Sequence, residues 1–316
     1  MRVVCPKCGM EGYLYYNRKL GFYVKHGSKR TCTGIPSDKA LEVVFEFDDR
    51  IALIRYMGGD FFLLTYLKNM VPPHFCYVEV FGGGAPLLLN KSPSPVEVYN
   101  DIDDNLVTLF RVVRDRYEEF IKKFDWLLAS RRDYYDYLKK IASNDFKDDL
   151  ERALAYFYVL RFAYAATLFK GLGFGPRKNN ARDFWSAVKK LRLIHERLKN
   201  VYIESLDFRE VIKKYDTPMT FFYCDPPHLY IGTEKGQGYY ARNFTDKDYM
   251  DLLTMLERIK GKFLLKQACY TPFVMNWAKQ HGYCVRSVSL KMAAKANPRA
   301  EKTDTYNVYF IANYKI

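Results

Sequence analysis

Short apolar runs recur along most of the chain, and stretches with the helical spacing of apolar residues separate them. From residue 76 onward these runs are Cys76–Phe81, Val96–Tyr99, Val201–Glu204, Thr220–Cys224, Lys262–Lys266, Cys284–Leu290 and Tyr306–Tyr314. Such runs are typical of strands that are buried on both faces. Strands that alternate with helices form a mostly parallel sheet covered on both sides, so the sequence predicts an α/β fold. An amphipathic pattern from Leu106 to about Tyr117 predicts one of the covering helices, with Asp104 as its candidate cap.

The first 36 residues differ in composition from the rest and hold three of the seven cysteines. Cys5 and Cys8 are two residues apart and precede a glycine, a spacing with which two thiolates bind one tetrahedral zinc ion. His26 and Cys32 are the natural second pair, so we predict a zinc-ribbon-like module over residues 1–36 with one structural zinc ion. The alternative is a small β hairpin with free thiols, because YLYYNRKLGFYVKH has the pattern of two strands around a turn.

The chain carries a formal net charge of +14 over 316 residues. Lys and Arg side chains release counterions from phosphates, so this excess favours a nucleic-acid partner; a generally basic proteome is the alternative. Aromatic residues make up 17% of the chain. Such rings either fill a core or provide surfaces on which unpaired bases stack, and composition alone does not separate the two.

Four further cysteines and the distribution of apolar residues indicate where the protein works. Cys76, Cys224, Cys269 and Cys284 lie in or beside apolar runs, and we predict that they are buried free thiols. Free thiols favour a reducing, intracellular setting. No apolar run reaches the roughly 18 residues that a spanning helix needs, so we expect no membrane partner.

A glycine-rich segment, YVEVFGGGA, begins at Tyr77 and follows the first of these strands. Glycines at this place let the chain turn sharply and bring backbone N–H groups close to a ligand. Asp101 stands about 20 residues further on, at the end of the next predicted strand, where a carboxylate accepts hydrogen bonds from ribose hydroxyls. Together the two features predict a cofactor that contains a nucleoside.

A second motif, FFYCDPPH, is an apolar strand that ends in Asp225, Pro226 and Pro227. Each proline fixes its own φ and keeps the preceding residue out of the helical region. The result is a rigid extended turn that holds a carboxylate at the carboxyl edge of the sheet. Open α/β sheets bind their ligands at that edge, so this motif indicates a catalytic turn.

With these motifs in view, the chain resembles the Dam-like N6-adenine-specific DNA methyltransferases, especially their phage and archaeal members. The resemblance runs from about Arg55 to the C-terminus. It rests on segments that occur in the family's order, namely RYMGGDFFLLTYL, YVEVFGGGAPLLLNK, SPVEVYNDIDDNLVTLFRVVRD, SLDFREVI, FFYCDPPHLY and NFTDKDYMDLLTMLERIKGKFLL. It implies transfer of a methyl group from S-adenosylmethionine to the exocyclic amine of an adenine that is flipped out of double-stranded DNA.

The resemblance also implies a domain plan. A Rossmann-like S-adenosylmethionine-binding catalytic domain would comprise residues 50–115 and 200–316. A helical target-recognition insert would comprise residues 116–199, and the zinc-ribbon-like module lies outside the family's common part. We expect the basic loop Gly171–Arg182 to contact DNA, and a solvated loop with no such contact is the alternative. The predicted contact residues are Lys170, Arg177, Lys178 and Arg182.

The family's functional residues are carried over by position. Asp225, Pro226, Pro227 and His228 would form the catalytic turn. The cofactor would be held by Gly58, Gly59, Glu79, Phe81, Gly82, Gly84, Asp101, Asp207, Phe208 and Asp225. Of these, Asp101 would hold the ribose, while Asp207 and Phe208 would meet the adenine.

Two positions depart from the family pattern. His228 stands where the family has Tyr, or less often Phe or Trp, and Asp60 stands where it has Lys. Either change could mark a weakened or inactive member, which keeps open a non-enzymatic DNA-binding protein on a degenerate methyltransferase fold. A separate alternative is a related methyltransferase that acts on cytosine N4 or RNA. For the enzyme itself we expect a monomer that acts on DNA in the cytoplasm, associated with the nucleoid. A cognate restriction endonuclease is a further candidate partner.

Overall fold

A computed structural model describes residues 2–4, 11–17, 21–26, 30–35, 50–54, 63–164, 168, 171–174, 179–227, 244–291 and 305–316. The chain divides into two compact units, Met1–Ile51 and Ala52–Ile316. No described helix is both long enough and apolar enough to cross a membrane.

The first unit is a four-stranded antiparallel sheet in the order β1-β2-β3-β4, formed by Arg2–Val4, Glu11–Asn17, Gly21–His26 and Arg30–Ile35. β2 and β3 are the two strands expected around a turn, with Tyr15 opposite Tyr23. In β4, Cys32 lies opposite Val24 of β3, and it is partly exposed.

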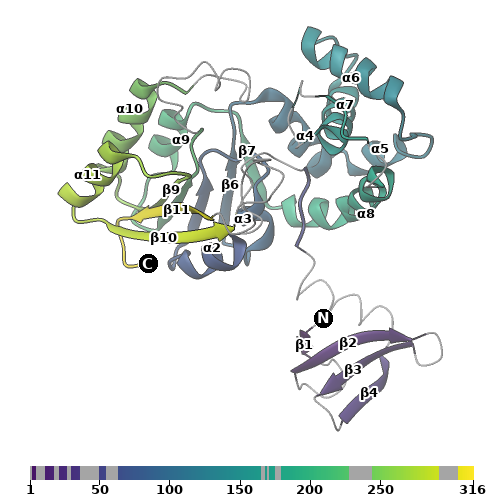
Figure 1. Ribbon diagram of the computed structural model, residues 1–316, viewed down its shortest axis with the longest axis horizontal. Helices are drawn as coiled ribbons and strands as arrows, with labels where there is room; N and C mark the ends of the chain where they lie inside the picture. The colour runs from purple at the N-terminus through teal and green to yellow at the C-terminus, as the bar shows by residue number, and fades with distance from the viewer. Residues whose placement is uncertain are drawn as a thin grey trace. The chain divides into compact units, whose positions relative to one another are not determined.

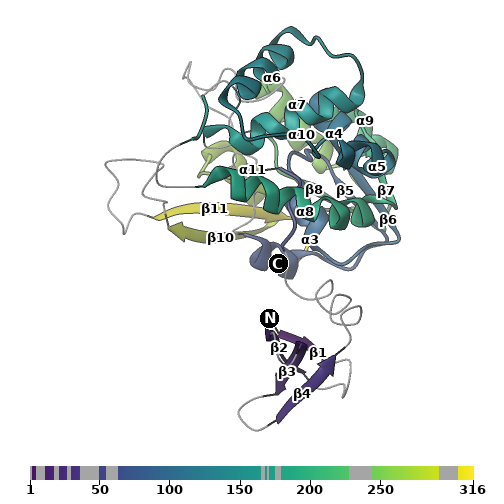
Figure 2. The same cartoon turned by 90° about the vertical axis from the view of Figure 1, so that its right-hand side faces the viewer.

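The second unit is built on a seven-stranded sheet in the order β10-β11-β9-β8-β5-β6-β7. Its strands are β5 (Cys76–Glu79), β6 (Val96–Asn100), β7 (Val201–Glu204), β8 (Thr220–Cys224), β9 (Lys262–Gln267), β10 (Cys284–Lys291) and β11 (Thr305–Ala312). The neighbours from β7 to β9 pair in parallel, whereas β11 runs antiparallel between β9 and β10. Figures 1 and 2 show β10 and β11 side by side at one edge. The predicted mostly parallel, Rossmann-like sheet is confirmed.

One face of this sheet is covered by α9 (Phe208–Tyr215), α10 (Asp246–Leu256) and α11 (Pro272–Gln280), which lie together in Figure 1. Alternate strand residues point into this layer, among them Val78, Phe222 and Leu265, and all three are fully buried. In each strand, the residues that alternate with these point to the opposite face of the sheet. There Tyr99 of β6 stacks on Phe110 of α4 (Asp104–Asp115), with ring centroids 4.1 Å apart.

The remaining helices are α2 (Leu64–Met70), α3 (Pro86–Asn90), α5 (Tyr117–Lys122), α6 (Arg131–Ser143), α7 (Asp149–Phe162) and α8 (Asn180–Leu198). Residues 117–198 are mainly helical, and α5 to α8 gather beside α4 in Figure 1. Their core is aromatic, with Phe184 packed against Phe124, Phe157 and Phe162. Much of the aromatic excess therefore fills a core, although Trp126 in the same region is 92% exposed.

Three sequence expectations need correction. The cap of α4 is Asp103 rather than Asp104, because Asp103 accepts a hydrogen bond from the Asn105 N–H. The expected loop Gly171–Arg182 is too long, since α8 begins at Asn180 with Asn179 as its cap. Cys76 and Cys224 are buried free thiols as predicted, but Cys269 is exposed and Cys284 only partly buried.

Candidate active site

The candidate site lies at the carboxyl ends of four neighbouring strands. The order β8-β5-β6-β7 is parallel throughout, so the segments that follow these strands meet at one edge of the sheet. The chain moves from β5 to β6 and β7 on one side and later adds β8 on the other. The edge between β5 and β8 is therefore the topological switch point, where open α/β sheets bind ligands.

The loop after β5 requires glycine by close packing. A Cβ at Gly82 would come within 2.3 Å of the Tyr99 ring, so a side chain there would displace that ring. Gly83 and Ala85 both have left-handed φ values, of 48° and 47°. The Gly82 N–H donates to the Asn100 carbonyl at 2.7 Å, which ties the loop to the end of β6. This loop brings backbone close to the strand ends, as a nucleoside-containing cofactor needs.

Asp101, directly after β6, faces this loop. Its Oδ2 accepts from the Gly83 N–H at 2.7 Å, and its Oδ1 accepts from the Asp103 N–H at 2.8 Å. Each carboxylate oxygen has a second lone pair, so capacity remains for a ligand hydroxyl. Burial raises the pKa of Asp101 to about 6, although the two N–H donors favour the ionised form. The residue thus fits the predicted role of ribose acceptor.

This pKa leads to a prediction for cofactor binding. If the ionised Asp101 accepts the ribose hydroxyls, protonation below about pH 6 removes part of that interaction. We expect the dissociation constant for S-adenosylmethionine to rise about tenfold between pH 7.5 and pH 5. Isothermal titration calorimetry without DNA measures it. Asp101→Asn should bind weakly at both pH values, and a wild-type affinity that is independent of pH would contradict the assignment.

Asn100 joins two of the four loops, and sequence reasoning missed it. It is 1% exposed. Its Nδ2 donates to the Val80 carbonyl at 2.9 Å and the Leu206 carbonyl at 3.0 Å, and its Oδ1 accepts from the Leu206 N–H at 2.9 Å. Asn100 therefore fixes the ends of β5 and β7 relative to β6. A polar residue closing the apolar run of β6 was the available signal.

Asp207 and Phe208 begin α9, beside an aromatic group formed by Phe81, Phe208 and Phe244. The three ring centroids lie 5.5 to 5.7 Å from one another. Asp207 caps α9 and is held by Arg209, whose guanidinium also binds Asp248 and Asp251 of α10. The pair that was assigned to the cofactor's adenine thus combines a fixed carboxylate with an apolar surface.

The Asp-Pro-Pro turn follows β8 at the same edge. Cys224 and Pro226 are buried, whereas Asp225 and Pro227 are partly exposed. Asp225 Oδ2 accepts a hydrogen bond from Lys266 Nζ at 2.8 Å. The motif therefore presents a partly exposed carboxylate beside the glycine loop, on the next strand of the sheet. Its salt-bridge partner Lys266 was missed in the sequence, where it appears as a lysine within an apolar run.

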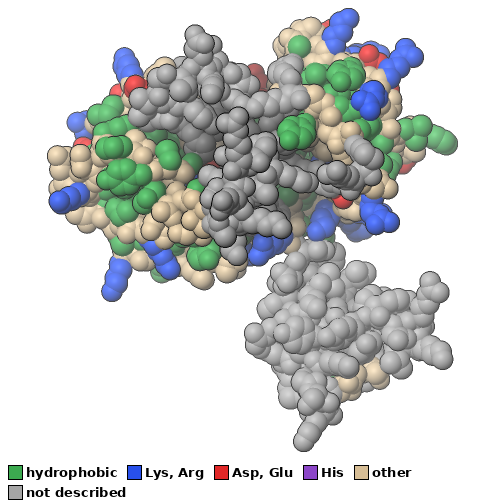
Figure 3. Space-filling view, viewed as in Figure 1, with side chains coloured by type: hydrophobic (Ala, Val, Ile, Leu, Met, Phe, Trp, Pro, Cys, Tyr) green, Lys and Arg blue, Asp and Glu red, His purple; other side chains and the backbone are tan. Residues whose placement is uncertain are grey.

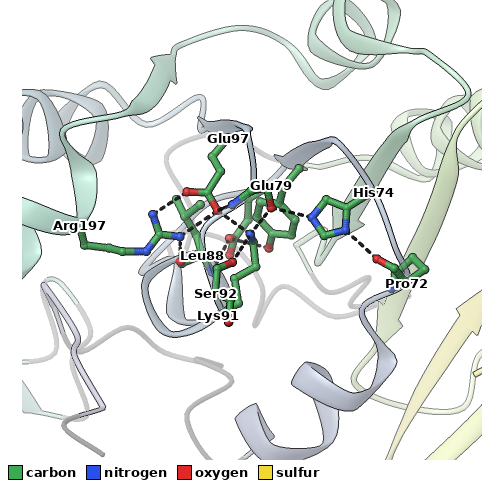
Figure 4. Close-up of polar contacts among 10 residues, drawn as sticks. Pro72, His74, Glu79, Leu88, Lys91, Ser92, Glu97 and Arg197 are labelled. Atoms are coloured by element: carbon green, nitrogen blue, oxygen red, sulfur yellow. Dashed lines mark hydrogen bonds and ion pairs between the residues drawn. The ribbon is translucent and has the colours of Figure 1, made fainter. Parts of the chain in front are cut away.

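A buried polar network supports the glycine loop from behind (Figure 4). Glu79 is 1% exposed, and its Oε2 accepts from the Tyr77 hydroxyl and from the Leu88 N–H of α3. Glu97 of β6 binds Lys91 and also Arg197 of α8. Arg197 Nη2 donates to the Leu88 carbonyl at 2.6 Å, so α3 is held from both sides.

Several predicted site residues lie outside the described residues. These are Gly58, Gly59, Asp60, His228, Cys5, Cys8, Lys170, Arg177 and Lys178, and the His26 side chain joins them. Arg182 is exposed on the first turn of α8. Within the described part of the chain, no group of three or more His, Cys, Asp or Glu side chains is placed to hold a metal ion.

Comparison with known proteins gives one family and a set of distant relatives. The model of the D12 class N6 adenine-specific DNA methyltransferases matches residues 56–292. DNA adenine methylase of Escherichia coli is 23% identical over 213 residues, which cover 65% of this chain and 75% of the relative. A type II methyltransferase of Lactococcus lactis is 22% identical over 268 residues, covering 79% of this chain and 92% of the relative. The matched range includes the glycine loop, Asp101, Asp207 and the Asp-Pro-Pro turn.

Proposed function

The chain belongs to the D12 class of N6 adenine-specific DNA methyltransferases, and on that premise we propose that methyl transfer takes place between the glycine loop after β5 and the Asp-Pro-Pro turn after β8. The observation that carries this proposal is the convergence of Gly83, Asp101, Asp207 and Asp225 at the ends of four adjacent strands. Methyltransferases of this family use S-adenosylmethionine, whose sulfonium group supplies an electrophilic methyl group.

The residues present fit that cofactor. Gly82 and Gly84 bring backbone close, and the ionised Asp101 accepts the ribose hydroxyls. Asp207 and the rings of Phe81 and Phe208 take the adenine. Glu79 is buried, and it supports the pocket by accepting a hydrogen bond from the Leu88 N–H rather than by contacting the cofactor from an exposed position. Gly58 and Gly59 complete the site around the methionine part in this proposal.

The chemistry of the turn follows from the weakness of an aromatic amine as a nucleophile. Its lone pair is delocalised into the ring. In our proposal the Asp225 carboxylate and the Pro226 carbonyl each accept one amine N–H, which favours a pyramidal nitrogen. Bound S-adenosylmethionine would supply the methyl group to this lone pair, and its sulfur would keep the electron pair of the methyl–sulfur bond. One amine proton passes by way of Asp225 to solvent. Alignment and electrostatics supply the acceleration.

The flipped adenine needs a wall to stack on, and we assign this to Pro227 and His228 at the end of the turn. An imidazole is smaller than the phenol ring usual at this position. It is therefore expected to contribute at the low end of the roughly 1–3 kcal/mol that such stacking gives. The departure at His228 weakens stacking in this proposal without removing it.

We assign recognition of the DNA sequence to residues 116–199, with Lys170, Arg177, Lys178 and Arg182 on the phosphates. On the face of the second unit that Figure 3 shows, the coloured Lys and Arg side chains are scattered rather than gathered in one stripe. The assignment therefore rests on two observations. Helices α5, α7 and α8 pack against α4, which follows β6 at the catalytic edge of the sheet, and Arg182 is exposed. Phosphate contacts of this kind set affinity, and base contacts set sequence choice.

The wider setting is also a proposal. One relative is a type II methyltransferase, which favours a partner restriction endonuclease for this chain too. We propose that the enzyme works as a monomer. We also place it in the cytoplasm, associated with the nucleoid, because its substrate is DNA and Cys76, Cys224, Cys269 and Cys284 are free thiols.

Nucleoside analysis of treated DNA tests the function. Duplex DNA incubated with the protein and S-adenosylmethionine should yield N6-methyladenine after digestion. N4-methylcytosine instead, or methylation of RNA alone, would favour a related amino-methyltransferase. Binding of DNA with no methylated product, and no affinity for the cofactor, would favour a non-enzymatic DNA-binding protein.

For residues 1–36 we propose one structural zinc ion bound by Cys5, Cys8, His26 and Cys32. The CxxC spacing supports it, as does a segment too small to build a large apolar core. Elemental analysis of protein purified under reducing conditions should find one zinc per chain, and the variant Cys5→Ser with Cys8→Ser should find none. The matched control Cys269→Ser, at an exposed thiol, should keep its zinc. Wild-type protein without stoichiometric zinc would refute the site.

A further inference from the structure

A lysine stands at the carboxyl end of the otherwise apolar strand β9, next to the catalytic turn. β8 and β9 are parallel, and Cys224 lies opposite Leu265. Lys266 follows Leu265 within β9, so it points to the face opposite the layer of α9 to α11, and Asp225 follows directly after the end of β8. The Lys266 side chain is 4% exposed and the Asp225 side chain 22%.

The lysine of the pair is thus shielded from solvent, whereas the aspartate carboxylate is partly accessible. Lys266 Nζ donates to Asp225 Oδ2 at 2.8 Å. Among the described residues, the other oxygen, Oδ1, has no hydrogen-bond partner. Burying an ammonium group costs free energy unless the group is paired. The burial of the Lys266 ammonium next to the Asp-Pro-Pro turn therefore indicates a specific role.

Two other described groups close to Asp225 are uncharged. Cys224 and Tyr249 both lie near its carboxylate, and burial raises the pKa of each well above its ordinary value. Both are therefore neutral at neutral pH, and Lys266 provides the countercharge. The torsion that orients an aspartate carboxylate is broad, so without a partner its two oxygens would not be distinguished.

We propose that Lys266 is a positioning residue for methyl transfer. It holds Oδ2 of Asp225 and so presents Oδ1 to the amine of the flipped adenine. It touches neither the base nor the cofactor in this role and acts through Asp225. The inference rests on the proposed function of Asp225 as the amine's hydrogen-bond acceptor.

The test compares Lys266→Met with Lys262→Met, which removes the same charge at the start of the same strand. Single-turnover methylation by Lys266→Met should be slower by about 10- to 100-fold, the scale of a small misplacement of a reacting group. Its dissociation constants for cofactor and DNA should stay within about threefold of wild type, and Lys262→Met should match wild type. Lys266→Arg, which keeps a charged donor, should recover part of the lost rate.

A double variant shows whether Lys266 acts through Asp225. In an Asp225→Asn background, Lys266→Met should cost little further rate, because coupled residues are not additive. This variant also lacks both charges and so guards against a loss of folding, which thermal unfolding of each protein checks. Lys266→Met with the wild-type rate, or a loss that appears only in cofactor affinity, would overturn the inference. A fully active Asp225→Ala would instead refute the proposed function on which it rests.

Discussion

Asp225→Ala should reduce single-turnover methyl transfer by at least about a hundredfold to a thousandfold, the usual cost of removing a group that stabilises charge in a transition state. The cofactor is assigned mainly to Asp101, Asp207 and the glycine loop, and the phosphates to basic residues of the insert. Dissociation constants for S-adenosylmethionine and for DNA should therefore stay within about threefold of wild type. Rapid-quench kinetics with radiolabelled cofactor, together with calorimetry, measure all three quantities.

Asp225→Ala also removes the hydrogen bond that Lys266 donates to Asp225 at a 4% exposed site. Some loss of stability is expected for that reason, so Asp225→Asn is the matched control. It keeps the shape of the side chain and an oxygen to accept from Lys266, yet lacks the negative charge. The assignment would be contradicted if a variant without the Asp225 carboxylate retained more than about a tenth of the wild-type rate. Such a rate corresponds to an increase of less than about 1.4 kcal/mol in the activation free energy.

Glu97→Ala should destabilise the fold by about 3–5 kcal/mol, because it removes the carboxylate partner of the buried Lys91 and of the partly buried Arg197. Glu97 is 2% exposed, and it accepts from Lys91 Nζ, from both terminal nitrogens of Arg197 and from the Ser94 N–H. Burial raises its pKa, but the hydrogen bonds and charges of Arg197 and Lys91 outweigh burial and hold the pKa below its usual value. The stabilisation is therefore complete at neutral pH and is lost as the pH falls below about 4.5.

Urea unfolding at pH 7.5 measures this effect. Glu119→Ala is the matched control, since Glu119 forms an exposed pair with Arg116 on α5, and such pairs contribute about 1 kcal/mol or less. Because Arg197 also holds the Leu88 carbonyl, Glu97→Ala should weaken cofactor binding as well. Equal stability for the two variants would contradict the account of the network.

The parts of the fold that depend on local pattern could be predicted from the sequence. Apolar runs such as Thr220–Cys224 became strands, and Asp-Pro-Pro was placed at a sheet edge because proline restricts its own backbone and its neighbour's. The predicted helix boundaries differ from those in the structure by one residue or more. Asp103 and Asp104 are equally good caps in sequence, and only the hydrogen bond to Asn105 distinguishes them.

The residues that join distant segments could not be predicted in the same way. Arg197 and Glu97 are separated by 100 residues, and Asn100 and Leu206 by 106, so their pairing is decided by the order of strands and helices in the folded chain. Lys266 is 41 residues from Asp225 and needs the register of β8 and β9 to be known. Sequence therefore predicted groups that belong to a motif, whereas the groups that hold the motif in place depend on tertiary structure.

The most direct test of the central claim is a crystal structure of the protein with S-adenosylhomocysteine, the product of the cofactor. The account predicts that its ribose hydroxyls lie within hydrogen-bond distance of Asp101 and that its adenine lies against Phe208 with Asp207 beside it. Its sulfur should then face Asp225 across the edge between β5 and β8. A product bound elsewhere, or bound at this edge with its sulfur turned away from Asp225, would contradict the account.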